Sequence, residues 1–255
     1  KGFDPESKVD IPIAKNMAER VEGLISAVAP QIKNSGMLDR VLELEKLYNK
    51  LDWRVALTIG LEIAKQKFCS FKDEREAMEV GIRVALAYLT LGVVASPLEG
   101  FTELKIKKRK DGKKYFCLMF SGPIRSAGTT VTFGSILAAD YIRKNMGYSS
   151  YDPTNEEVKR MVTELYDYHE KVSNLQYLPS EEEIIFMVSN LPMQIDGEPS
   201  EKYEVSNYKD LERIETNRIR NGPCLVIGES LTQKAAKAWA YCNKWINEFG
   251  LENWD

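Results

Sequence analysis

Apolar residues recur at helical spacing through the first ninety positions of the chain. Val55, Ile59 and Ile63, for example, follow one another every four residues, as on one face of a helix. Asp73 with Glu76 three residues later has the pattern of a capping box at a helix start. The pattern predicts helices at about 14–25, 37–50, 52–63 and 73–92, after an irregular start at 1–14 with Pro5 and Pro12. We therefore expect a helical N-terminal lobe over residues 1–95.

The pattern changes to alternation near residue 100. Leu104 and Ile106 alternate with lysines, Asp111-Gly112 is a strong hairpin signal, and residues 115–120 are continuously apolar. This predicts a β-hairpin whose second strand is buried on both faces. Gly147 is suited to cap a helix over 131–146.

Residues 151–255 mix helical and turn-rich stretches. Capping boxes predict helix starts at Thr154 and at Ser180. From 193 to 229 we expect strands and turns, with hairpin turns at Asp196-Gly197 and Asn221-Gly222 and a short buried strand at 224–227. A last amphipathic helix is predicted over 232–249, with an aromatic side that includes Trp239 and Trp245 and packs on the domain or on residues after Asp255. The predicted fold class is α+β: a helical N-terminal lobe packed with a small antiparallel β and helix region over residues 96–255.

Composition narrows the class of protein. The 255 residues are 44% hydrophobic and 29% charged, which is typical of a folded globular chain. No apolar run approaches a membrane span, so we expect no membrane contact and a cytoplasmic location. The four cysteines lie far apart without CxxC spacing, and with one histidine, His169, they form no recognisable zinc site. Reduced thiols and a structural role for His169 are the expected outcome.

Charge is distributed unevenly along the chain. Residues 101–150 carry ten Lys and Arg against three Asp and Glu, whereas residues 151–215 carry six against sixteen. Much of the positive charge lies on the predicted hairpin, at Lys105, Lys107, Lys108, Arg109, Lys110, Lys113 and Lys114. These residues suit contact with a nucleic-acid backbone. A solvated hairpin whose lysines discourage edge pairing explains them better, because aromatic residues for base stacking are sparse at the tip.

A glycine-rich turn follows the second hairpin strand. Gly122 and Gly128 flank Arg125 and Ser126, and a helix follows, so backbone N–H groups and an arginine face one loop. This arrangement predicts an anion-binding turn at Arg125, Ser126 and Gly128, although no Walker or GxGxxG pattern is present. The alternative is a structural turn in which Arg125 pairs with a buried acid.

Downstream, the polar run Glu215–Arg220 places Arg218 and Arg220 on one face of a predicted strand. There they would clamp a phosphate or pair with nearby acids. The acids of the Asp196-Gly197-Glu198 loop suit Mg²⁺ in type, but an Asp-Gly turn explains them better. We predict no catalytic residue and no metal site in this sequence.

Several of these segments together resemble the N-terminal region of the large subunit of archaeal family D DNA polymerase. The resemblance covers about residues 9–255. It is carried by Pro97-Leu98-Glu99-Gly100, Ser121–Gly128, Asp140-Tyr141-Ile142-Arg143, Leu175–Glu183, Ile195–Pro199 and Glu215–Arg220. The sequence departs from the family pattern at Thr129–Thr132, where the family is richer in Gly and Ala, and in several loops.

The resemblance implies a part of a replicative, Mg²⁺-dependent polymerase with a small subunit that carries a 3′–5′ exonuclease. The family's catalytic carboxylates lie downstream, so no catalytic residue is carried over and no cofactor is expected in this region itself. The implied partners are the catalytic core of the same large subunit and the small exonuclease subunit. A role in assembly, core packing and regulation is expected. The alternatives are a DNA-binding module that contacts primer–template DNA through the hairpin and a free-standing phosphate-handling enzyme.

Overall fold

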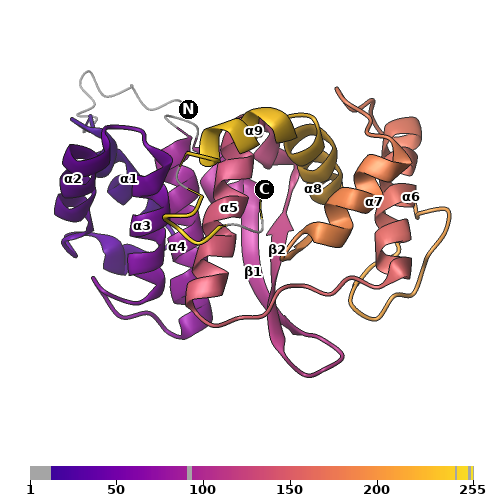
Figure 1. Cartoon of the computed structure of the whole chain (residues 1–255), viewed down its shortest axis with the longest axis horizontal. Coiled ribbons are helices and arrows are strands. Elements are labelled where there is room, and N and C mark those ends of the chain that lie inside the picture. Colours follow the sequence, from indigo (N-terminus) through magenta and orange to yellow (C-terminus); the bar gives the residue numbers. More distant parts are fainter. Residues whose placement is uncertain (1–12, 91–93, 245, 252–253, 255) are drawn as a thin grey trace, which may run out of the picture.

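The computed structural model describes residues 13–90, 94–244, 246–251 and 254. Helices dominate it, and a small sheet lies near its centre (Figure 1). The N-terminal helices lie at one end of the molecule, and the 155–190 helices lie at the other. The observed fold class is α+β, as predicted.

The N-terminal helices follow the predicted apolar pattern closely. They are α1 (Met17–Ile25), α2 (Met37–Tyr48), α3 (Trp53–Ala64) and α4 (Glu74–Leu89), with a 3₁₀ turn η1 (Pro30–Ile32) after α1. The Asp52 and Asp73 side chains cap α3 and α4 by accepting backbone N–H bonds. The predicted lead-in over 1–12 and the predicted end of α4 at Gly92 lie outside the described residues.

A mixed three-stranded sheet follows a π-helical turn, η2 (Ser96–Gly100). Strand β1 (Phe101–Lys108) pairs antiparallel with β2 (Lys114–Phe120), and β2 pairs parallel with β3 (Gln194–Asp196). The prediction of an interior second strand is confirmed, because β2 is central and its residues 115–120 are buried. The parallel β3 makes the sheet mixed rather than antiparallel.

Three further helices connect and flank the sheet. A 3₁₀ turn, η3 (Gly122–Ala127), leads into α5 (Thr129–Asn145), which packs against α3 and α4. The predicted capping boxes at Thr154 and Ser180 are both present and begin α6 (Asn155–Lys171) and α7 (Glu181–Asn190). His169 accepts a hydrogen bond from the Leu175 backbone at 3.0 Å, which is a structural contact.

The region from 193 to 229 differs most from the prediction. Asp196-Gly197 ends β3 instead of turning a hairpin, and Asn221-Gly222 begins the short helix α8 (Asn221–Cys224). The predicted strand at 224–227 is helical: it lies in α8 and in the π-helix η4 (Leu225–Thr232) that continues it. A short apolar run is compatible with either a buried strand or a buried helix, and tertiary packing selected the helix here.

The C-terminal helix is shorter than predicted, because α9 spans Ala235–Cys242. Within α9, Ala238 is buried but Trp239 is 44% exposed. Trp245 lies outside the described residues. Leu251 is buried, and the Trp254 indole donates to Asp140 on α5 at 2.8 Å. The chain therefore folds back across α5 after α9.

The main hydrophobic core includes residues from both predicted regions, from Ala18 to Leu251. Helix α4 packs against α3, α5 and β1, so the core continues past residue 95. Division at that residue stays a prediction. Cys69, Cys117 and Cys224 are free thiols. None of the described helices has the length and apolar character needed to cross a membrane.

Candidate functional site: a junction of the turn segments

The glycine-rich turn is fixed against the η2 segment by short polar contacts. The Ser121 backbone N–H donates to the Gly100 carbonyl at 2.9 Å, and the hydroxyls of Ser96 and Ser126 lie 2.7 Å apart. A side chain at Gly100 would come within 2.7 Å of the Ile124 backbone, so the two turns require a glycine where they meet. Two of the segments that carry the family resemblance therefore form one unit.

The end of β2 is enclosed by two further glycines. Gly197, after β3, and Gly222, in α8, both lie so close to the Phe120 carbonyl oxygen that a β-carbon at either position would collide with it. This explains why Asp-Gly and Asn-Gly occur here without forming hairpin turns. The glycines serve close backbone approach, which no other residue allows.

Arg125 pairs with a buried acid. Its guanidinium donates to Glu229 at 2.9 Å, and Glu229 also accepts the Gln176 backbone N–H at 2.9 Å. The Glu229 side chain is 4% exposed, whereas the Arg125 side chain is 42% exposed. The contact agrees with the structural interpretation of the turn and ties it to η4 and to the 175–183 segment. Ser126 and Gly128 are exposed beside Arg125, so an anion could still reach this turn.

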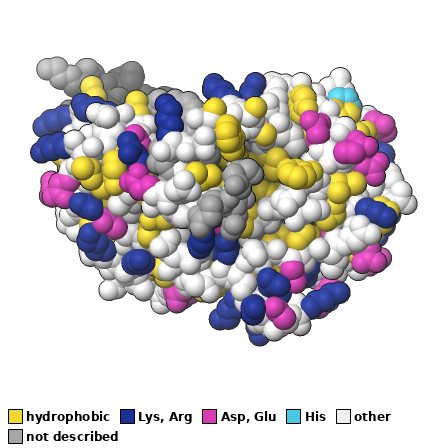
Figure 2. Space-filling model, in the orientation of Figure 1, with side chains coloured by type: hydrophobic (Ala, Val, Ile, Leu, Met, Phe, Trp, Pro, Cys, Tyr) yellow, Lys and Arg dark blue, Asp and Glu magenta, His cyan; other side chains and the backbone are white. Residues whose placement is uncertain are grey.

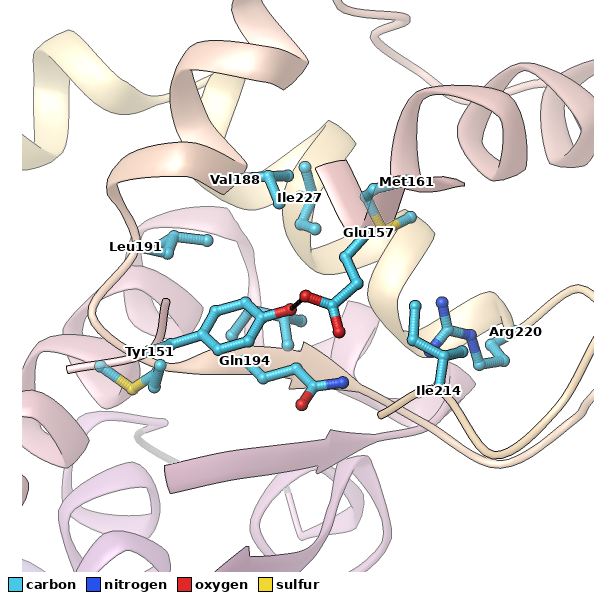
Figure 3. Close-up of a pocket in the computed structure, with 11 residues that line it drawn as sticks. Tyr151, Glu157, Met161, Val188, Leu191, Gln194, Ile214, Arg220 and Ile227 are labelled. Atoms are coloured by element: carbon cyan, nitrogen blue, oxygen red, sulfur yellow. Dashed lines mark hydrogen bonds between the residues drawn. The ribbon is translucent and has the colours of Figure 1, made fainter. Parts of the chain in front are cut away.

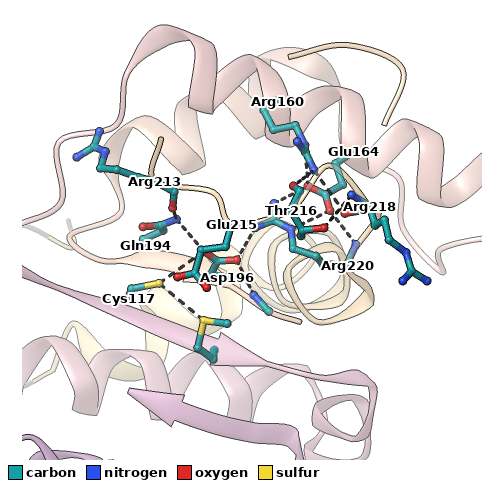
Figure 4. Close-up of polar contacts among 12 residues, drawn as sticks. Cys117, Arg160, Glu164, Gln194, Asp196, Arg213, Glu215, Thr216, Arg218 and Arg220 are labelled. Atoms are coloured by element: carbon teal, nitrogen blue, oxygen red, sulfur yellow. Dashed lines mark hydrogen bonds and ion pairs between the residues drawn. The ribbon is translucent and has the colours of Figure 1, made fainter. Parts of the chain in front are cut away.

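Arg220 lies at the centre of a buried ion-pair network (Figure 4). Its Nε and its backbone N–H donate to Glu164 Oε1 at 2.9 and 2.8 Å, and its Nη1 pairs with Asp196. Arg160 donates to Glu164 from one helical turn away at 3.2 Å. Helix α6, strand β3 and the 216–220 segment are therefore joined by charged groups that water does not reach.

Burial and neighbouring charges shift the pKa values of Arg220 and Asp196 in opposite directions. Burial alone would lower the pKa of Arg220, but Glu164 and Asp196 outweigh it and hold that pKa well above its ordinary value. Burial would likewise raise the pKa of Asp196, but Arg220 and Lys107 hold it below its ordinary value. Burial, with Asp196 beside it, raises the pKa of the Cys117 thiol. Arg220 and Asp196 are therefore charged at neutral pH, and the Cys117 thiol is protonated.

The two arginines predicted to share a strand face do not share one. Glu204 and Arg218 form an isolated bridge instead of a strand. The Arg218 side chain is exposed and donates to the Glu201 carbonyl, whereas Arg220 is buried. Arg220 fulfils the acid-pairing alternative, and its guanidinium does not reach the surface.

The hairpin cations divide into two groups. Lys105 pairs with Glu215 at 2.8 Å, Lys107 pairs with Asp196 at 3.2 Å, and Arg109 lies 3.4 Å from Asp152. The acidic region thus neutralises the inner cations within the same chain. The outer cations are exposed: Lys108, Lys110, Lys113 and Lys114. Figure 2 shows their end of the molecule as a gathering of basic side chains, where Figure 1 places the hairpin tip.

Arg213 is a key residue that the sequence analysis missed. It pairs with Glu157 at 2.6 Å and with Asp152 at 2.6 Å, and it lies over the rings of Tyr115 and Tyr151. Arg160 and Glu164 were missed as well. Their signal was present, because an Arg and a Glu four residues apart flank the apolar stripe of α6.

A small cavity lies beside the network (Figure 3). Tyr151 donates to Glu157 at 3.0 Å at its wall, and Met161 and Ile227 contribute apolar surface. Its free volume of about 20 Å³ fits one water-sized molecule, which excludes a substrate. Within the described ranges, no group of His, Cys, Asp and Glu is arranged to hold a metal ion.

The network and the turn contacts define a structural junction of the kind that holds a polypeptide scaffold together.

Comparison with known proteins gives the family. Over residues 1–255 the chain matches the family described as "DNA polymerase II large subunit DP2, N-terminal". The chain belongs to this family, the N-terminal region of the large subunit of archaeal family D DNA polymerase. The resemblance inferred from the sequence is therefore confirmed.

Individual relatives agree with this family assignment. Over the whole of this chain, the DNA polymerase II large subunit of Nanoarchaeum equitans is 50% identical, and those of Methanosarcina barkeri and Archaeoglobus fulgidus are each 44% identical. The matched region is 20% of the first relative and 21% of the other two. The chain thus spans about a fifth of the length of these relatives. This family assignment speaks against the interpretation as a free-standing phosphate-handling enzyme.

Proposed function

We propose that this region is a non-catalytic assembly domain of the polymerase large subunit, which packs against the catalytic core and helps to regulate it. The observation that carries the proposal is the junction around Phe120 and Arg220. There Arg220 and Asp196, which lie in two of the family segments, pair with each other, and Arg220 also binds Glu164 of α6. Residues arranged in this way stabilise a rigid body.

The proposed partners are the catalytic core of the same large subunit and the small exonuclease subunit. The relatives are named as large subunits, which implies a smaller one, and four-fifths of their length lies outside the matched region. Mg²⁺ would serve the polymerase as a whole, at carboxylates outside these residues. Arg125 links the surface of the domain to its interior, because its side chain is partly exposed and pairs with the buried Glu229.

The test uses the full-length large subunit with Arg125→Ala. Loss of the Glu229 contact should lower the thermal midpoint or weaken co-elution with the small subunit in size-exclusion chromatography, because it leaves a buried carboxylate without its cation. Arg218→Ala is the matched control, since Arg218 is an exposed arginine that binds only a backbone carbonyl. An unchanged midpoint together with unchanged subunit binding would reject the proposal.

A second candidate function is DNA-backbone binding by the hairpin tip. The observation that favours it is the exposure of Lys108, Lys110, Lys113 and Lys114 at the hairpin tip, where only Lys113 has an acid partner among the described residues, Asp111 at 3.8 Å. Phosphate contacts would give an affinity that falls steeply with salt.

Fluorescence anisotropy of primer–template DNA across a salt series tests this second function. The variant changes Lys108, Lys110 and Lys113 to Glu and leaves the ion-paired Lys107 and Arg109 intact. The control changes Lys33, Lys65 and Lys72, which are exposed on the helical lobe, to Glu. A weaker and less salt-dependent affinity in the hairpin variant alone would support the function, and equal behaviour of the two variants would reject it.

A further inference from the structure

The loop between α2 and α3 has an unusual backbone conformation. Asn49 and Leu51 have φ values of 80° and 64°, and a leucine in the left-handed region is unfavourable. The conformation is held by buried groups: the Leu51 N–H donates to the Tyr88 hydroxyl at 2.9 Å, and that hydroxyl donates to Glu45 at 2.9 Å. Tyr88 and Glu45 are 1% and 8% exposed. The strained loop is thus fixed with the Leu51 side chain 45% exposed.

Leu51 lies where two surface grooves meet. Grooves of about 400 and 320 Å³ both include Leu51 and Trp53 in their lining. Leu89 and Val131 continue the lining of the smaller groove, so α3, α4 and α5 all contribute to an apolar floor. Leu51 therefore stands as an exposed aliphatic side chain beside an apolar depression.

The edge of this depression is positively charged. Lys50, Lys237 and Lys244 line the grooves or the adjoining loop, are exposed, and form no ion pair with another described residue. The nearby acids share one arginine, because Asp52 pairs with Arg54 at 2.9 Å and Glu248 lies 3.9 Å from Arg54. The three lysines and Arg54 therefore outnumber these two acids, and a partner with carboxylates would supply further counter-charge.

We propose that this groove binds a segment of the large subunit outside these 255 residues, in which an apolar side chain is flanked by Asp or Glu. The inference rests on the proposed assembly function and names one of its contact surfaces. The apolar side chain would pack against Leu51 and Val131, and the carboxylates would bind Lys237 and Lys244. Four-fifths of the length of the relatives lies outside the matched region, which provides the source of the segment.

The lining favours a protein segment over a nucleic acid. Single-stranded nucleic acids bind on exposed aromatic rings, on which their bases stack. The aromatic residues that line the grooves are buried: Trp53 is 8% exposed and Tyr88 is 1% exposed. In the smaller groove the accessible apolar side chains are the aliphatic Leu51 and Val131, which suit a Leu-like or Ile-like side chain.

Photo-crosslinking in the full-length large subunit tests this inference. A benzophenone amino acid replaces Leu51, and the crosslinked peptides are identified by mass spectrometry with and without the small subunit and DNA. The matched control carries the same group at Leu47, which is 68% exposed on α2 and is not part of the groove lining. We expect crosslinks from position 51 to an acidic segment of the same subunit beyond residue 255, and few from position 47.

A charge-reversal pair provides the second measurement. Lys237→Glu with Lys244→Glu should lower the crosslink yield from position 51 several-fold, whereas Lys65→Glu with Lys72→Glu should leave it unchanged. Crosslinks to the small subunit, to DNA or to a segment without acids would overturn the inference, as would a yield no higher than that from position 47. If these results are obtained while Arg125→Ala still weakens assembly, only the groove inference is rejected and the proposed assembly function is kept. If Arg125→Ala has no effect on stability or assembly, the assembly function itself is rejected.

Discussion

The buried network around Arg220 and the exposed tip of the hairpin show how differently one kind of ion pair behaves in two environments. In the network, Arg220 and Asp196 have side chains that are 2% and 4% exposed, and Lys107 joins them from β1. At the tip, Lys113 and Asp111 lie 3.8 Å apart with side chains that are 66% and 42% exposed. Exposed pairs contribute about 0–1 kcal/mol, whereas removing one member of a buried pair costs about 3–5 kcal/mol.

The difference assigns separate roles to the two groups of charges. The buried network joins α6, β3 and the 213–220 segment, so its charges determine how distant parts of the chain meet. At the tip, Lys108, Lys110 and Lys114 are exposed and form no ion pair with another described residue, so their charges are available to another molecule. Burial alone therefore separates the charges that hold the chain together from those that face solvent.

The largest expected effect is that of Arg220→Met. The substitution leaves the buried carboxylates of Glu164 and Asp196 without their main cation, so the free energy of unfolding should fall by about 3–5 kcal/mol. Equilibrium urea unfolding measures it. Arg218→Met, at the exposed arginine two residues earlier, should change stability by no more than about 0.5 kcal/mol. A loss below about 1 kcal/mol for Arg220→Met would mean that the buried network does not support the fold.

Lowering the pH should have a smaller effect on the free energy of unfolding. The pKa of Asp196 lies below its ordinary value of 3.8 in the folded protein, so its stabilisation is present above that value and is lost as the pH falls through the folded pKa. In the Asp196→Asn variant the side chain at this position does not titrate. The stability difference between the native protein and this variant should therefore be constant near neutral pH and should shrink below about pH 4. Urea unfolding between pH 7 and pH 3 measures it, and a difference independent of pH would contradict the assignment.

The smallest effect is expected within the hairpin itself. Lys113→Met at the tip should change the free energy of unfolding by no more than about 0.5 kcal/mol. Lys107→Met in the buried network should destabilise the protein by about 1.5–3 kcal/mol, because Lys107 donates to Asp196 and to the Arg213 carbonyl. Thermal or urea unfolding of the two variants side by side gives the comparison. Equal losses would show that the network and the tip do not differ as their burial implies.

Much of the local structure followed from neighbouring residues in the sequence. The caps at Asp52, Asp73, Thr154 and Ser180 and the hairpin at Asp111-Gly112 formed as predicted, because each depends on hydrogen bonds within a few residues. The family was also readable from the sequence, since its short segments occur in order.

The errors occurred where the partner of a residue lies far away in the chain. Asn221-Gly222 has the sequence of a hairpin turn, yet it begins a helix because Gly222 must pass the Phe120 carbonyl a hundred residues earlier. Arg220 looked like its neighbour Arg218, but contact with Glu164 buried one and left the other exposed. Nothing in the local pattern distinguished these two arginines.

The sequence by itself therefore determined the helices up to residue 190, the hairpin, the family and the composition of the charged segments. Tertiary structure alone decided which charges face inward, because burial depends on segments that are separated in the chain and meet only in the folded state. It also decided that β3 lies parallel to β2 and that the strained loop at Leu51 borders an apolar groove. Local hydrogen bonds are encoded within one turn, whereas desolvation of a charge is a property of the whole fold.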